Sequence, residues 1–114
     1  MSFLGKILIS AVAILVSAYL LPGVIVESFF SALILAFVLS FLNFILKPIL
    51  IIFTIPLTIM TLGLFLLVIN AVLILLADSL VPGFYVDGFW WALIFSLLLS
   101  LTNSLLLELS GKKD

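Results

Sequence analysis

Two stretches of the chain decide its fold because they are copies of one another. Residues 20–34 read LLPGVIVESFFSALI, and residues 80–94 read LVPGFYVDGFWWALI. At this offset of 60 residues the match continues without a gap, and 16 of the 37 positions from 10 to 46 equal their counterparts. Shared hydrophobicity alone would align Leu, Ile and Val, but not a Pro-Gly pair, an acid and an aromatic residue in one register. The sequence therefore predicts two copies of one structural unit.

Each copy reads as an apolar helix, a Pro-Gly turn, a short extended stretch and a second apolar helix. We expect the four helices at residues 4–21, 29–46, 64–81 and 89–108. Each is close to the ~20 residues with which an α-helix crosses a ~30 Å hydrocarbon core. Proline ends a helix, and the glycine after it lets the backbone turn. The residues of the two turns are Pro22, Gly23, Pro82 and Gly83.

The composition predicts a membrane protein. Of the 114 residues, 68% are hydrophobic and only 8% are charged, whereas soluble domains have about 25% charged residues. A soluble domain of this size could not bury so much apolar surface. We expect one all-α membrane domain, residues 1–114, with four transmembrane helices arranged as two helical hairpins. Its parts are a first repeat at 4–47, a connecting segment at 48–62 and a second repeat at 64–108.

The connecting segment is the hardest part to place. Residues 47–62 read KPILIIFTIPLTIMTL, and the stretch after Pro48 would span only ~22 Å as a helix. We expect a re-entrant or interfacial segment, or a kinked lead-in to the third helix. Hydroxyls in this segment can bond backbone carbonyls that proline leaves free, or alternatively line a conduction path. The candidate residues are Thr54, Pro56, Thr58 and Thr61.

The charged residues predict the orientation in the membrane. If the connecting segment does not cross and the N-terminus is cytoplasmic, every lysine lies on the cytoplasmic side, as the positive-inside rule requires. The lysines are Lys6, Lys47, Lys112 and Lys113. Glu27, Asp78 and Asp87 then lie at the opposite interface, where we expect Asp78 to be simply exposed. Both termini are cytoplasmic in this arrangement, and the two units are parallel about an axis along the membrane normal.

Polar side chains within the apolar helices are the candidate functional residues, because lipid cannot hydrogen-bond to them. They are Ser40, Asn43, Asn70, Ser100 and Asn103. In both second helices the Asn follows the Ser by three residues, so each pair shares one helix face. Asn70 has Ser10 as its counterpart. We expect interhelical hydrogen bonds from these residues, and the alternative is a path for ions or water.

The sequence offers little for catalysis. It has no Cys and no His, and every basic residue is a lysine. Paired carboxylates within the helices, a phosphate loop and a metal-ligand cluster are all missing from it. We expect no enzyme activity, no cofactor and no metal ion. The net charge of −1 also gives no reason to expect a nucleic-acid partner.

The pattern resembles the YvlD-type small bacterial membrane proteins, which are grouped by sequence with phage-holin family 4. The first half carries PGVxVxSFFxAL at 22–33, LN at 42–43, LKP at 46–48, IPLT at 55–58 and TLG at 61–63. The second half carries VINA at 68–71 and PGFxVxGFWxA at 82–92. The resemblance covers nearly the whole chain, with Ser28 where a Gly would fit equally well. It implies a bacterial inner-membrane protein of about four helices, an association with cell-envelope stress modules, and no catalytic residues.

Three functions are compatible with these features. We favour a structural or accessory protein of the bacterial envelope, such as a component of a stress response. The alternatives are a holin-like pore former that assembles through the small-residue faces of its helices, and a small transporter or channel with a path along the repeat axis. The expected partners are the lipid bilayer and either a second copy of the chain or another membrane protein.

Overall fold

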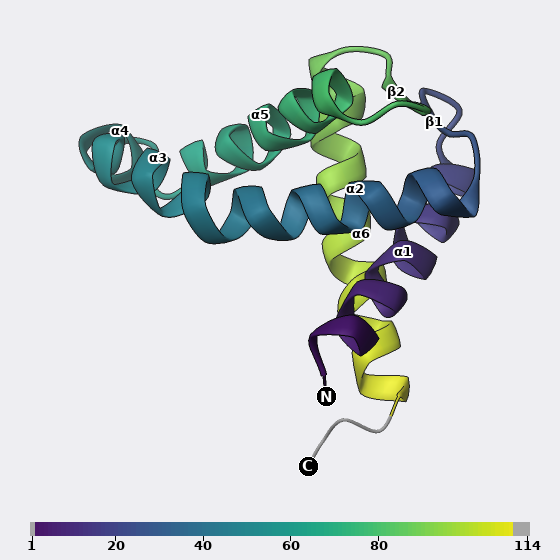
Figure 1. The fold of residues 1–114 in the computed structure, drawn as a ribbon. Coiled ribbons are helices and arrows are strands. Elements are labelled where there is room, and N and C mark those ends of the chain that lie inside the picture. The colour runs from purple at the N-terminus through teal and green to yellow at the C-terminus, as the bar shows by residue number, and fades with distance from the viewer. Residues whose placement is uncertain (1, 111–114) are drawn as a thin grey trace.

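The computed structural model describes residues 2–110, and most of them are helical (Figure 1). In chain order the elements are α1 (Phe3–Leu20), β1 (Val24–Val26), α2 (Phe29–Phe41), the π-helix η1 (Leu42–Leu46), α3 (Lys47–Phe53), α4 (Ile55–Met60), α5 (Phe65–Leu80), β2 (Phe84–Val86) and α6 (Phe89–Leu109). Three helices are long and apolar enough to cross a membrane: Phe3–Leu20, the continuous helix Phe29–Phe53, and Phe89–Leu109. A shorter apolar helix, Phe65–Leu80, is the fourth.

The second apolar helix is longer than the sequence predicts. We expect it to end at residue 46, but η1 and α3 continue it to Phe53. Pro48 lacks an N–H group, and its ring would press on the carbonyl four residues earlier in a regular helix. The wider turn of η1 precedes it directly, and Pro48 falls in the first turn of α3, where proline is tolerated. The expected end of this helix at residue 46 is therefore too early.

The helices form two arms that meet at one corner of the molecule. In Figure 1, α1 and α6 run side by side toward the foot of the picture, and we call this pair the first arm. The second arm comprises α2, η1, α3 and α5, and it runs to the left. Across the corner α1 packs on α2, and α5 packs on α6. Each arm thus contains one long helix from each half of the chain.

The two extended connectors pair with each other at this corner, which we call the ribbon end. The strands β1 and β2 are antiparallel, and Ile25 lies opposite Tyr85, its own counterpart. Beside the strands, a backbone N–H of each half donates to a carbonyl of the other: Glu27 to Gly83 at 2.8 Å, and Asp87 to Gly23 at 2.9 Å. Both bonds join counterpart positions, so this small ladder is symmetric about the Ile25–Tyr85 pair.

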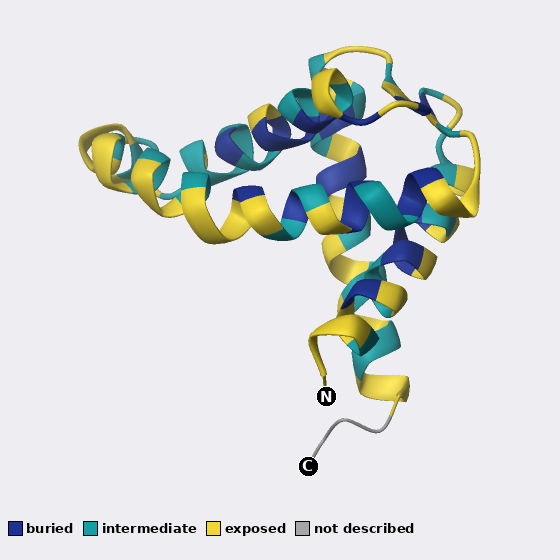
Figure 2. Ribbon diagram, in the orientation of Figure 1, coloured by how far each residue is buried: buried dark blue, intermediate teal, exposed yellow. Residues whose placement is uncertain are grey.

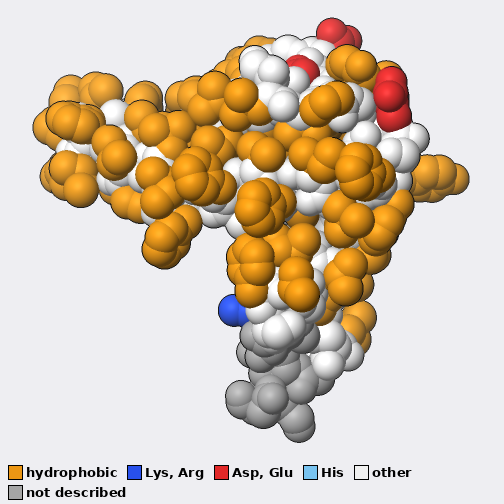
Figure 3. All heavy atoms as spheres, in the orientation of Figure 1, with side chains coloured by type: hydrophobic (Ala, Val, Ile, Leu, Met, Phe, Trp, Pro, Cys, Tyr) orange, Lys and Arg blue, Asp and Glu red, His pale blue; other side chains and the backbone are white. Residues whose placement is uncertain are grey.

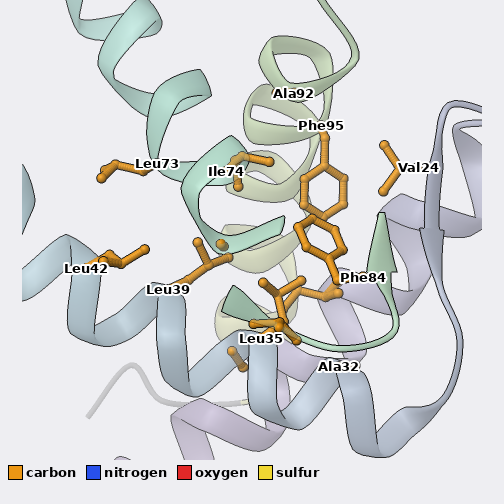
Figure 4. Close-up of a cluster of buried hydrophobic side chains, with 14 of the residues drawn as sticks. Val24, Ala32, Leu35, Leu39, Leu42, Leu73, Ile74, Phe84, Ala92 and Phe95 are labelled. Atoms are coloured by element: carbon orange, nitrogen blue, oxygen red, sulfur yellow. The ribbon is translucent and has the colours of Figure 1, made fainter. Parts of the chain in front are cut away.

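The apolar core lies where the arms cross, next to the ribbon end (Figure 2). Phe84 of β2 and Phe95 of α6 are fully buried, with ring centroids 5.7 Å apart. Their counterparts Val24 and Leu35 are also buried in this cluster (Figure 4). Most of the remaining surface is apolar (Figure 3), which suits helices that face lipid.

Candidate functional site

Polar side chains gather below the core, where the two arms diverge. Two adjoining pockets of about 210 and 90 Å³ open here, and they share Leu39, Asn43, Leu99 and Ser100. We call them together the polar pocket. Its polar residues are Ser10, Ser40, Asn43, Lys47, Asn70, Ser96, Ser100 and Asn103. The pocket therefore brings together all five intramembrane polar candidates from the sequence.

The lining of the polar pocket repeats at the offset of 60 residues. From the two second helices it takes the counterpart pairs Leu39 and Leu99, Ser40 and Ser100, and Asn43 and Asn103. Ser10 of α1 lines the larger pocket, and its counterpart Asn70 of α5 lines the smaller one. Lys47 departs from this pattern in charge, because the counterpart position holds Leu107. Charge is thus the feature that distinguishes the two sides of the pocket.

Hydrogen bonding also differs between the two sides. The Ser10 hydroxyl donates to the side-chain oxygen of Asn103 at 3.3 Å, which joins α1 to α6. Seven residues further along α1, Ser17 donates to the Thr102 hydroxyl at 3.4 Å. Within residues 2–110, the amide of Asn43 has no such protein partner, and it lies exposed at the pocket mouth. Asn103 therefore acts as an interhelical contact, whereas Asn43 is available to bind something else.

Local chain geometry explains the position of Asn43. It lies in η1, the π-turn that precedes Pro48. A π-turn inserts an extra residue into a helix and redirects the side chains around it, and such turns are frequent at functional sites. The first half of the chain has this turn, whereas Asn103 lies within the regular helix α6.

Lys47 supplies the charge of the polar pocket. It is half-buried in the first turn of α3 and lines the smaller pocket beside Asn43 and Asn70. All the other residues that line either pocket are uncharged. The acidic side chains visible in Figure 3 lie at the ribbon end, and Glu108, near the end of α6, lines neither pocket. From the sequence we expect Lys47 only to determine the orientation in the membrane. Its spacing of four residues from Asn43 is the signal that both side chains lie on one face of the helix.

The connecting segment is structurally separate from the polar pocket. The Thr54 hydroxyl donates to the Leu50 carbonyl at 2.7 Å, and the Thr61 hydroxyl donates to the Leu57 carbonyl at 2.9 Å. Pro56 lies in the first turn of α4. The Thr58 hydroxyl is buried and has no hydrogen-bond partner among the described residues. The four candidates of this segment are thus placed in the α3–α4 turn and its flanks, and none of them lines the pocket.

The glycines of the two turns lie against counterpart positions of the opposite half. A Cβ atom at Gly23 would collide with the Trp91 ring, and one at Gly83 would collide with the Ser31 hydroxyl. Gly83 also has a φ of +84°, a conformation that other residues rarely adopt. Pro22 and Pro82 are exposed beside these glycines. Each turn therefore depends on a close approach of backbone to the other unit.

Asp78 has a contact that the sequence reading misses. We expect it to be simply exposed, but its carboxylate accepts a hydrogen bond from the Val86 backbone N–H at 3.2 Å. This bond ties the end of α5 to β2. The counterpart of Asp78 is Ala18, so the first half has no equivalent bond. The described residues contain no group of three acidic residues that could hold a metal ion.

Comparison with known proteins places the chain in a family. A family model described as mycobacterial phage holin with four transmembrane segments, superfamily IV, matches residues 1–105. The uncharacterized membrane protein YvlD of Bacillus subtilis is 40% identical over 102 residues, which cover 89% of this chain and 86% of the relative. An uncharacterized protein of Streptomyces coelicolor is 38% identical over 112 residues, with 90% of each chain covered.

No solved structure gives a significant match to the chain. The resemblance to the YvlD-type proteins that the sequence predicts is confirmed. Neither the description of the family nor the names of these relatives designates an enzyme. This chain is therefore a membrane protein that belongs to superfamily IV of the phage holins with four transmembrane segments.

Proposed function

We propose that the protein is a non-enzymatic accessory component of the bacterial cytoplasmic membrane, where it supports another membrane protein of the envelope under stress. Membrane embedding follows from the family and from the apolar helices. The accessory role, the orientation and the repeat arrangement are our proposal. We propose that α1 with α2, and α5 with α6, are two parallel hairpins joined by a segment at the cytoplasmic interface.

The distribution of charge supports this orientation. Lys6 lies near the start of α1, at the foot of the first arm, and Lys47 begins α3 in the second arm. The acidic residues Glu27, Asp78 and Asp87 lie in or beside the ribbon end. The positive-inside rule then favours a ribbon end outside the cell and cytoplasmic ends of both arms. Lys112 and Lys113, which belong to the same expectation, lie outside the described residues.

The observation that carries the accessory role is the apolar layer above the polar pocket. Leu35, Phe84 and Phe95 are fully buried in the apolar core beside the ribbon end, and they line neither pocket. A pore or transporter needs a polar path that reaches both sides of the membrane, because ions cannot cross a packed hydrocarbon layer. The described lining of the polar pocket includes no residue of β1 or β2, so it does not extend to the ribbon end. A pocket confined to one part of the molecule suits a protein that binds a partner or ligand.

The polar pocket itself favours a second candidate function, a small channel or transporter. Counterpart residues from both halves line it, as expected for a path near the repeat axis. Conduction would require separation of Phe84 from Phe95. The holin-like alternative would require several copies to associate through the exposed apolar faces of the arms. Both alternatives predict that ions cross the membrane when the protein is present.

A membrane-potential assay tests the accessory role against both alternatives. The protein is expressed from an inducible promoter in bacteria loaded with a potential-sensitive dye, beside an empty vector. We expect the potential to stay equal to that of the vector, and chemical cross-linking to capture a defined membrane partner. A collapse of the potential at matched expression would contradict the accessory role and support a pore.

Single-cysteine labelling tests the orientation, since the chain has no cysteine of its own. Ser79→Cys lies at the ribbon end, and Ser2→Cys lies at the foot of the first arm. We expect a membrane-impermeant thiol reagent to label Ser79→Cys in intact spheroplasts, but Ser2→Cys only after permeabilisation. Thr61→Cys, in the connecting segment, should behave like Ser2→Cys. The opposite labelling of Ser2→Cys and Thr61→Cys would refute parallel hairpins.

A further inference from the structure

We propose that the polar pocket binds the phosphate ester of an anionic membrane lipid, with Lys47 as its counter-ion. This inference depends on the membrane setting, which the family gives. It does not depend on the accessory role or on the orientation, so it can fail while they hold. The lipid is defined here by its chemistry: a phosphodiester with one negative charge and long acyl chains.

The charge and the donors of the pocket select an anion. Lys47 is half-buried, and its side chain is the one charged group among the residues that line the pocket. A charge taken out of water is costly unless it has an opposite charge as a partner. A phosphodiester carries one negative charge, which matches one ammonium. The amides of Asn43 and Asn70 and the hydroxyl of Ser100 line the same space and can donate to its oxygens.

A neighbouring apolar groove indicates that the anion belongs to a lipid. Phe3, Phe37, Phe41 and Phe44 line a groove of about 200 Å³ that meets the polar pocket at Ser40. The rings of Phe3 and Phe37 pack edge to face, with centroids 6.3 Å apart. A soluble phosphate would use only the polar pocket. A phospholipid would fill both spaces, with its phosphate near Lys47 and an acyl chain against the aromatic rings.

The spacing along the helix fits the dimensions of one lipid leaflet. Positions 40, 43 and 47 lie on one face of the long helix, and positions 37, 41 and 44 lie on the adjacent face. From Lys47 back to Phe37 the helix rises about 15 Å, which is about half of the ~30 Å hydrocarbon core. An acyl chain that starts near Lys47 would therefore lie beside these rings within one leaflet.

The two halves differ at this site, which sets the stoichiometry. The counterparts of Lys47 and Phe44 are Leu107 and Ser104, so the second unit lacks both the cation and the aromatic ring nearest to it. The second unit also has a regular helix where the first has η1. We therefore expect one anionic lipid for each chain, although the pocket is built from paired residues.

Native mass spectrometry of the full-length protein in neutral detergent tests the proposal. Phosphatidylglycerol and phosphatidylcholine are titrated in parallel, and we expect one phosphatidylglycerol to bind preferentially. Loss of one charge-assisted hydrogen bond should weaken this binding about tenfold in Lys47→Gln. Lys6→Gln is the matched control, because Lys6 is exposed and lines neither pocket nor groove. Lys47→Arg retains the charge and should retain the preference.

Two further measurements distinguish binding of a lipid from binding of a free anion, and loss of binding from loss of folding. Glycerol 3-phosphate at the same concentrations should show no binding, and Phe41→Gln should weaken phosphatidylglycerol binding while it keeps Lys47. Circular dichroism and elution volume verify that each variant is folded; if Lys47→Gln is not, Asn70→Leu replaces it, with an expected loss of several-fold. Equal loss in Lys6→Gln and Lys47→Gln, an unchanged preference in Lys47→Gln, or tight binding of glycerol 3-phosphate would each overturn the proposal.

Discussion

The ribbon end and the polar pocket are built from the same repeat but use it differently. At the ribbon end the contacts come in matched pairs: Ile25 faces its own counterpart, and the bonds of Glu27 and Asp87 mirror each other. At the pocket the positions are matched but the chemistry is not. Ser10 bonds to Asn103, while their counterparts Asn70 and Asn43 have no such bond within residues 2–110. Lys47 faces no second lysine across the pocket.

This difference indicates that the two regions have different roles: the ribbon end stabilises the fold, and the polar pocket binds. The ribbon end keeps its pairing because the contacts of the β1–β2 ladder join the halves, and a change in one half disturbs both. The pocket tolerates divergence because a polar cavity can be lined by several combinations of Ser and Asn. Substitutions at the ribbon end should therefore affect stability, whereas those in the pocket should affect binding. Four predictions test this, in order of decreasing effect on the free energy of unfolding.

Truncation of the buried aromatic pair should have the largest effect. Phe84→Ala removes a fully buried ring that packs on Phe95. A large-to-small change of this kind costs about 3–5 kcal/mol of unfolding free energy. Denaturant titration in mixed micelles measures it, and Phe30→Ala, an exposed aromatic on α2, is the control with an expected change near zero. Equal losses in both variants would show that the layer above the pocket is not a packed core.

The turn glycines should come next. Gly83→Ala places a Cβ against the Ser31 side chain at a φ of +84°, and we expect a loss of about 2–3 kcal/mol from strain and collision together. Gly88 has a φ of +106° but open space around it, so Gly88→Ala should lose only the backbone component of about 1 kcal/mol. The same titration separates the two. A second change, Ser31→Gly, should recover part of the loss in Gly83→Ala, and no recovery would contradict the collision.

The bond of Asp78 is an asymmetric contact at the ribbon end, because its counterpart position holds Ala18. Asp78→Ala leaves the Val86 N–H without its acceptor, which should cost about 1 kcal/mol. Asp78→Asn keeps an acceptor oxygen and should cost less. Hydrogen exchange at the Val86 amide gives a direct measurement, with faster exchange expected in Asp78→Ala. Unchanged exchange would mean that Asp78 has only an interfacial role.

Substitutions of the two asparagines of the second helices should have the smallest effect on the free energy of unfolding. We expect a small loss at Asn103 and no loss at Asn43. Asn103→Leu removes the bond from Ser10, and such bonds between transmembrane helices are worth about 0.6 kcal/mol. Asn43→Leu removes no bond to the described protein, so its unfolding free energy should stay the same or rise. Comparison of both variants with the wild type by thermal unfolding in detergent tests this. A larger loss of stability in Asn43→Leu than in Asn103→Leu would contradict the conclusion that Asn103, and not Asn43, holds two helices together.

Helix positions follow from the sequence because they depend on local features. Apolar runs and Pro-Gly turns place α1 and α5 within one residue of the expected bounds. Pro48 misleads because its effect depends on the turn before it: a regular helix would end there, but η1 accommodates the ring. The extended connectors are evident from their β-branched and aromatic residues. Their pairing is not, since three residues carry too little information to specify a partner strand.

The polar candidates show the same limit of local information. Their shared helix faces follow from the spacing of three residues between Ser40 and Asn43. Which of them bond and which stay open depends on how the arms meet, and this is a property of packing between helices distant in sequence. The position of Lys47 beside Asn70 depends on the same distant contacts. The bond of Asp78 spans only eight residues, and it depends on how the turn between α5 and β2 folds back. Counterpart positions with unlike residues, such as Lys47 and Leu107, mark where the two halves have diverged.

The symmetry of the β1–β2 ladder about Ile25 and Tyr85 also bears on how the protein can be assembled. A strand that pairs with its own copy in antiparallel register is self-complementary, so the same interface can close between two molecules as well as within one. A peptide that contains a single helix–turn–helix unit should therefore dimerise head to head in a bilayer. The covalent link through α3 and α4 would then act mainly as a tether, which raises the effective concentration of one half near the other.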